Sequence, residues 1–170
     1  MVLLQYRVPE NDYPITYPYH YSTWGGKWQG NNPLEEAERE LSEELLPSLV
    51  KAVVGKLEQQ GIYLMPLPTS MAEAEKAGVS NLVNEGFTHW LNWMFSARIA
   101  SLNEFFRNCM QGGLGYKVPE GFAQIHSINT LPPEKDFMSD YKKVVRHIVL
   151  GEEQKIIFGK SVADLEVKIV

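Results

Sequence analysis

A helix bounded by two prolines constrains this sequence more than any other feature. Asn32 can cap a helix through its side chain, Pro33 suits the first helical position, and Glu35 follows the cap by three residues. Pro47 lacks an N–H and its ring disfavours helix, so a break or kink is predicted near Leu46. Between the prolines, apolar residues recur at helical spacing, namely Leu34, Ala37, Leu41 and Leu45. This stripe predicts a helix with one face against a core.

The segments around this helix alternate between strand-like and helix-like patterns. Strands are predicted at residues 2–7, 62–67, 88–99 and 120–128, with final strands at 155–158 and 165–170. Further helices are predicted at residues 49–61, 102–110 and 137–150, and a surface helix or loop at 69–86. The mixed order favours an α/β or α+β fold. The 170 residues suit a single domain over 1–170.

Composition excludes several classes of function. The formal net charge of -5 gives no basic field that would attract nucleic-acid phosphates or an anionic membrane surface. No apolar run approaches the roughly 18 residues of a membrane helix, so we expect no membrane partner and a cytoplasmic location. Cys109 is the only cysteine, which excludes an internal disulfide and a thiolate zinc site. Small phosphorylated ligands remain open, because a metal ion can bridge an acidic site to a phosphate.

Carboxylates cluster on one face of the predicted helix. Glu40 shares its face with Glu43 and Glu44, and Glu36 lies one turn earlier. Such neighbours repel one another by several tenths of a kcal/mol per pair. A hard divalent cation such as Mg²⁺ or Mn²⁺ would offset this repulsion. A solvated acidic face explains the same run of residues, so both interpretations stay open at this point.

The spacing around the helix resembles a known motif. Gly25-x5-Asn31-x7-Arg39-Glu40-Leu41-x-Glu43-Glu44-x-Leu46-Pro47 is similar, over residues 25–47, to the box of the Nudix hydrolase superfamily, Gly-x5-Glu-x7-Arg-Glu-U-x-Glu-Glu-x-Gly-U, where U is a bulky aliphatic residue. The segments at 2–7 and 120–126 resemble the first and last core strands of that family, so the resemblance spans most of residues 2–150. Asn31, Leu46 and Pro47 depart from the box.

The resemblance implies a mixed β-sheet sandwiched between helices, with a helical insertion around residues 47–86. It also implies hydrolysis of a nucleoside diphosphate linked to another group. In that interpretation Glu40, Glu43 and Glu44 hold Mg²⁺ or Mn²⁺, and Glu40 is a further ligand or a general base. Arg39 orients a glutamate, and Glu120 is a candidate second base.

Residues for a small nucleotide-like substrate follow from the same resemblance. Gly25 and Gly26 would let backbone amides approach the phosphates, and Lys27 would contact them. Trp24 and Trp28 can stack on a nucleobase, although aromatic residues at this density are also typical of a core. A homodimer is possible, with the 47–86 region as its expected interface.

Two other functions remain open. The departures at Asn31 and Leu46 favour a degenerate Nudix-like domain that binds or senses a nucleotide without catalysis. The apolar pairs Leu49-Val50 and Val53-Val54 favour a helical protein-interaction module in which the acidic face is only solvated.

Overall fold

The computed structural model describes residues 1–9, 15–27, 29–30, 32–45, 47–98, 116–151 and 158–159. Several predictions lie outside these residues: Trp28, Asn31, Leu46, Cys109, the helix at 102–110 and the strand at 165–170. In the described part of the chain, no helix combines the length and the apolar character needed to span a bilayer.

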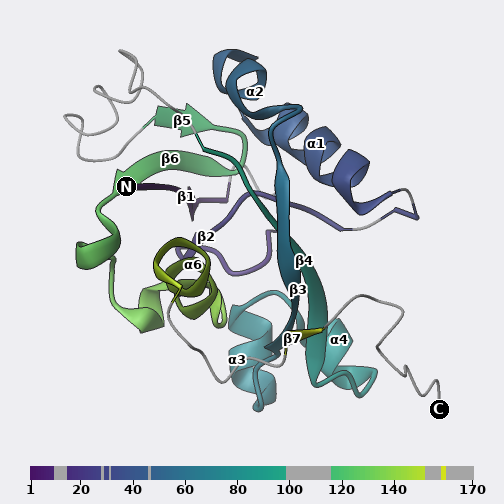
Figure 1. Cartoon of the computed structure of the whole chain (residues 1–170). Coiled ribbons are helices and arrows are strands. Elements are labelled where there is room, and N and C mark those ends of the chain that lie inside the picture. The colour runs from purple at the N-terminus through teal and green to yellow at the C-terminus, as the bar shows by residue number, and fades with distance from the viewer. Residues whose placement is uncertain are drawn as a thin grey trace.

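The described strands form two sheets (Figure 1). The first sheet has the order β2 (Tyr21–Ser22), β1 (Val2–Arg7), β6 (Gly121–His126) and β5 (Tyr116–Val118). The second has the order β4 (His89–Ser96), β3 (Glu58–Pro66) and β7 (Phe158–Gly159). Every pairing between these strands is antiparallel. The fold is therefore α+β with antiparallel sheets, and the mixed sheet that we expected does not occur among the described strands.

The helices are α1 (Pro33–Glu44), α2 (Pro47–Val53), α3 (Met71–Lys76), α4 (Ser80–Asn84) and α6 (Tyr141–Leu150). Two short 3₁₀ helices, Ile128–Thr130 and Glu134–Asp136, lie between β6 and α6. The predicted helix at 137–150 is thus confirmed from Tyr141 onward, and the predicted strands at 2–7, 88–99 and 120–128 are confirmed within a few residues.

The first helix begins and ends where its sequence predicts. The Asn32 side chain accepts a hydrogen bond from the Leu34 N–H at 2.9 Å, which satisfies one of the free amides of the first turn. The chain is extended at Leu45, and Pro47 begins α2. The predicted break between two helical segments is therefore confirmed.

The second helical segment was predicted too long. It ends at Val53 rather than near Gly61, and β3 begins at Glu58. Gly61, which resembles a helix terminator in the sequence, has φ 155° and lies at a register shift between β3 and β4. The region 47–86 is consequently not wholly helical: it supplies a strand whose Tyr63 and Met65 are fully buried.

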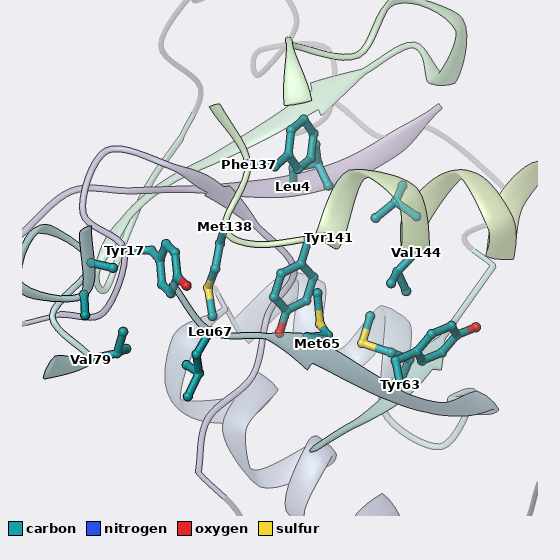
Figure 2. Packing of buried hydrophobic residues seen from close by; sticks show 14 of the residues in the cluster. Leu4, Tyr17, Tyr63, Met65, Leu67, Val79, Phe137, Met138, Tyr141 and Val144 are labelled. Carbon is teal, nitrogen blue, oxygen red and sulfur yellow. The ribbon is translucent and has the colours of Figure 1, made fainter. Parts of the chain in front are cut away.

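Two hydrophobic clusters determine where α1 lies. The larger cluster joins both sheets to α6 through Leu4, Met65, Tyr141 and Val144 among others (Figure 2). The smaller joins α1 and α2 to the first sheet, with members that include Leu45, Leu49, Val53, Leu3 and Ile125. Because successive side chains of a strand point to opposite faces, Leu3 shares its face with Gln5 and Arg7. That face of β1 is the one toward α1.

Candidate functional site

A cleft of about 1440 Å³ gathers most of the predicted site residues. Its lining includes Trp24, Gly25, Gly26, Lys27, Glu40, Glu44 and Glu120. A separate hollow of about 460 Å³ contains none of them. Arg39 and Glu43, also predicted for the site, do not line the cleft. Trp28 lies outside the described residues.

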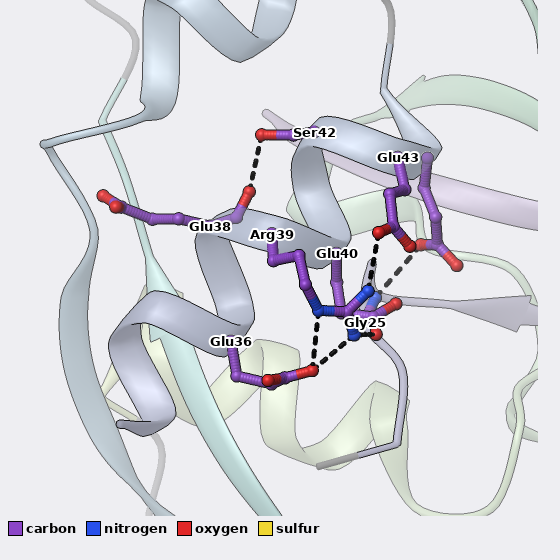
Figure 3. A network of polar contacts seen from close by, with 8 residues as sticks. Gly25, Glu36, Glu38, Arg39, Glu40, Ser42 and Glu43 are labelled. Atoms are coloured by element: carbon purple, nitrogen blue, oxygen red, sulfur yellow. Dashed lines mark hydrogen bonds and ion pairs between the residues drawn. The ribbon is translucent and has the colours of Figure 1, made fainter. Parts of the chain in front are cut away.

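Arg39 is the centre of the acidic face of α1 (Figure 3). Its guanidinium donates to Glu36 from Nε at 2.9 Å and to Glu43 from Nη1 at 2.7 Å, and its Nη2 pairs with Glu36 and Glu40. These carboxylates raise the pKa of Arg39 further above its ordinary value, the hydrogen bonds to Glu36 and Glu43 being the largest cause. A single cation thus offsets much of the repulsion that the sequence predicts on this face.

Glu44 is the most deeply buried carboxylate of the predicted metal-binding group, with 7% of the residue exposed. Its Oε2 accepts a hydrogen bond from the Gly25 N–H at 3.2 Å. The pKa of Glu44 is raised to about 7, chiefly by burial and also by the charge of Glu120, while the Gly25 hydrogen bond and the charge of Arg7 oppose the shift. Glu44 is consequently able to take up or release a proton near neutral pH.

Glu120 reaches the same site from the hairpin between β5 and β6. Val118 pairs with Gly121, so the hairpin loop has two residues and Glu120 is the second. Glu120 has φ 61°, a left-handed conformation that residues other than glycine rarely adopt. Its Oε2 lies 2.8 Å from Arg7 Nη2, and its backbone oxygen accepts from the Val8 N–H at 3.0 Å.

Arg7 is a site residue that the sequence analysis did not identify. With 7% of the residue exposed, it donates from Nε to the Thr16 oxygen at 2.9 Å and from Nη1 to Gln5 Oε1 at 3.1 Å, in addition to its pair with Glu120. The only signal for Arg7 in the sequence is its position, as a cation, at the end of the predicted strand 2–7. The residue that it pairs with becomes apparent only from the register, in which Arg7 lies opposite Gly121.

Gly25 and Gly26 both contact carboxylates of α1. We predicted that these glycines let backbone amides approach phosphates, and in the structure the Gly25 N–H donates to Glu44. Because Gly26 has no side chain, the Glu40 carboxylate can lie against it; a Cβ at Gly26 would collide with that carboxylate. Lys27 is exposed at the rim of the cleft, and Trp24 packs partly buried against the smaller hydrophobic cluster.

The carboxylates of the site are ligands that suit a hard divalent cation, but their side chains do not converge on one point. Glu40, Glu43 and Glu44 all offer carboxylate oxygens, which Mg²⁺ and Mn²⁺ prefer. Among the described residues, however, no three His, Cys, Asp or Glu side chains are grouped so that they could hold an ion. Glu40 and Glu43 bind Arg39 instead, and Glu44 accepts from Gly25. Arg39 therefore occupies one oxygen of Glu40 and one of Glu43, and would compete with an ion for these carboxylates.

Tyr141 connects this site to the second sheet. Its hydroxyl donates to Asn92 Oδ1 at 3.1 Å and is also hydrogen-bonded to Thr23. Burial raises the pKa of Tyr141, while the Thr23 hydrogen bond and the charge of Arg7 oppose that shift. The cleft is thus bounded by the carboxylates of α1 on one side and by β4 on the other.

Comparisons of the chain with protein-family models, with curated proteins and with solved structures give no match.

Proposed function

We propose that this protein is a metal-dependent hydrolase that cleaves the diphosphate of a nucleoside diphosphate-linked substrate, on a Nudix-like fold. The observation that carries the proposal is the meeting of Glu44 and Glu120. The two residues are far apart in the chain, yet the charge of Glu120 raises the pKa of Glu44. Both line one cleft together with Gly25 and Gly26.

The arrangement of carboxylates supports this chemistry. Glu40, Glu43 and Glu44 would hold Mg²⁺ or Mn²⁺ once Arg39 releases the first two. Such an ion neutralises diphosphate oxygens and lowers the pKa of a bound water. Glu44, with a pKa of about 7, is suited to accept a proton at neutral pH, and Arg7 keeps Glu120 within the same cleft.

The packing around α1 supports a Nudix-like sandwich. Leu3 and Ile125 of the first sheet contact the α1–α2 side, and Leu4 of the same sheet contacts the cluster that contains α6. Helices consequently cover both faces of this sheet. The size of the cleft, about 1440 Å³, is ample for a nucleotide-sized ligand.

A substrate panel tests the proposal. Nucleoside diphosphate-linked compounds are incubated with the protein, with Mg²⁺ or Mn²⁺ and with a chelator, and the phosphorylated products are measured. We expect turnover only with the metal, and a loss of about 100-fold or more in Glu44→Gln. The matched control is Glu35→Gln, an exposed residue of α1 that does not line the cleft and should keep the wild-type rate. Absence of turnover with either metal, or an undiminished rate in Glu44→Gln, would overturn the proposal.

The second candidate is a Nudix-like domain that binds a nucleotide without catalysis. The ion pairs of Arg39 with Glu36, Glu40 and Glu43 favour this candidate, because these carboxylates already bind a cationic side chain of the protein. Stabilisation of the fold by a nucleotide, without any product in the panel, would select this candidate.

The structure also accounts for the apolar pairs that suggested a protein-interaction helix. Leu49 and Val53 are buried against Leu45, whereas Val54 is 38% exposed. Val53→Asp would therefore place a charge in a hydrophobic cluster, and its effect on a partner could not be separated from a loss of folding.

A further inference from the structure

Two side chains of β4 share one face of the second sheet. Trp90 and Asn92 are two residues apart on the strand, so they point to the same side. They pair in register with Met65 and Tyr63 of β3. Both are partly exposed and both line the cleft that contains Glu44 and Glu120.

Each of these side chains has a buried donor without an acceptor. The Asn92 Oδ1 accepts from the Tyr141 hydroxyl at 3.1 Å, so the free arm of its amide is Nδ2. Neither Asn92 Nδ2 nor Trp90 Nε1 finds a hydrogen-bond partner within the described residues. Folded proteins rarely leave such groups unpaired, and two donors cannot satisfy each other. What both nitrogens lack is an acceptor.

The charge of the cleft limits which acceptor fits. Five carboxylates line it, those of Glu36, Glu40, Glu44, Glu58 and Glu120, and they outnumber the cations Arg7, Lys27 and Arg98. An anionic acceptor would be repelled there in the absence of a metal ion, whereas a neutral carbonyl oxygen would not. The indole of Trp90 packs next to the Tyr17 ring, with centroids 5.7 Å apart, and Trp90 itself offers an aromatic surface to the cleft.

We propose that Trp90 and Asn92 recognise a keto nucleobase through the carbonyl oxygen that guanine carries at C6 and uracil at C4. The inference rests on the proposed function for the choice of a nucleotide, and it adds which bases the cleft prefers. Adenine and cytosine carry an amino group at these positions, so there they would present a donor to two donors. Both nitrogens are covered in the described arrangement, and rotation of the partly exposed side chains would present them to the base.

Neutral nucleosides test this preference without metal or diphosphate. Inosine is compared with adenosine, and uridine with cytidine, by titration of the ¹⁵N-labelled protein followed by NMR. The protein has 4 tryptophans, and the Trp90 indole N–H signal is identified by its absence in Trp90→Phe. We expect inosine and uridine to shift this signal downfield and to bind about ten-fold more tightly than their amino counterparts.

Two variants separate recognition from folding. Asn92→Asp keeps an oxygen for Tyr141 and replaces the free donor by a charged acceptor. Trp90→Phe removes the indole N–H and leaves a smaller aromatic ring without a charge. Each should reduce the preference to about two-fold or less. The matched controls are Asn84→Asp, at an exposed position of α4, and Trp93→Phe, which also lines the cleft but lies on the opposite face of β4. Both should keep the wild-type preference.

The inference would be overturned by equal affinities, by a preference for the amino bases or by absence of nucleoside binding. It would also be overturned by an unchanged Trp90 signal, or by a preference for the keto bases that survives in both variants. None of these results depends on turnover. Metal-dependent hydrolysis in the substrate panel could still succeed if they occur, and keto-base binding could persist if hydrolysis fails.

Discussion

Arg7 Nη2 lies 2.8 Å from Glu120 Oε2, and this ion pair fixes a hairpin carboxylate beside the carboxylates of α1. The two residues are 113 positions apart in the chain and meet because β1 and β6 pair with Arg7 opposite Gly121. Glu120 adopts the left-handed conformation at φ 61°, where glycine would be favoured, so its side chain rather than its backbone preference explains its presence there.

Removal of Arg7 should therefore damage stability more than removal of the charge of Glu120. Arg7→Met leaves Glu120, Gln5 Oε1 and the Thr16 oxygen without their donor, and we expect the free energy of unfolding to fall by about 2–3 kcal/mol. Glu120→Gln keeps an acceptor for Arg7 and should lose less than half of that. Denaturant titration of both variants measures the difference, and equal losses would argue against the pair.

The burial of Glu44 predicts a specific dependence of stability on pH. Its pKa is about 7 in the folded chain against an ordinary value of 4.5, so the folded state binds the proton more tightly than the unfolded state does. The contribution of Glu44 to the free energy of unfolding is fully present below about pH 4.5 and is lost as the pH rises through 7. Glu44→Gln should stabilise the protein by up to about 3 kcal/mol at pH 8 and by little at pH 4.

Chemical denaturation of wild type and Glu44→Gln across this range measures the effect, with Glu35→Gln as the exposed control. Parallel curves for wild type and Glu44→Gln would show that Glu44 ionises as freely in the folded chain as in the unfolded one.

Gly26 and Gly121 should respond differently to the same substitution. A Cβ at Gly121 would collide with the backbone oxygen of Tyr6, at a φ of 139° that a side chain rarely adopts, so Gly121→Ala should cost about 3 kcal/mol or more of unfolding free energy. At Gly26 the obstacle is the flexible end of Glu40. Gly26→Ala should cost less than about 1 kcal/mol and displace Glu40 from its position in the cleft. Thermal and denaturant unfolding compare the two variants, and a similar loss in both would contradict this account.

Arg39→Met should make the acidic face of α1 sensitive to pH. The guanidinium contacts Glu36, Glu40 and Glu43, and without it these carboxylates repel one another. We expect the free energy of unfolding to fall at pH 7, and the loss to diminish toward pH 4 as the carboxylates take up protons. Addition of salt at pH 7 should recover part of the loss by screening. A loss that is the same at both pH values would indicate that Arg39 acts through packing alone.

Local signals explain why α1 could be predicted from the sequence. Asn32, Pro33 and Pro47 act within a few residues of themselves, and each does in the structure what its side chain predicts. Gly61 shows the limit of this reasoning. A glycine after an apolar helical pattern predicts a helix end, yet here it allows an irregularity within β3, whose pairing with β4 prevails over the local preference.

The site depends on contacts between distant residues, which spacing alone does not reveal. The positions of Glu40, Glu43 and Glu44 on one helix follow from helical periodicity. Their partners do not: Arg39 pairs with Glu40 and Glu43, and the Glu43 side chain remains largely exposed. The sequence indicates Glu120 only through resemblance, and it does not indicate Arg7 as a site residue. Both reach the cleft through the pairing of β1 with β6, and that register is specified by packing on both faces of the sheet.

The central claim is that the carboxylates of α1 bind the divalent ion on which hydrolysis depends. Calorimetric titration of the protein with Mn²⁺ tests it most directly, for wild type, Glu44→Gln and the exposed control Glu35→Gln. We predict saturable binding in wild type that strengthens as the pH rises toward 7, where Glu44 loses its proton, and that is unchanged in Glu35→Gln. Glu44→Gln should weaken binding about ten-fold or more. No saturable binding in wild type, or equal affinity in Glu44→Gln, would contradict the account.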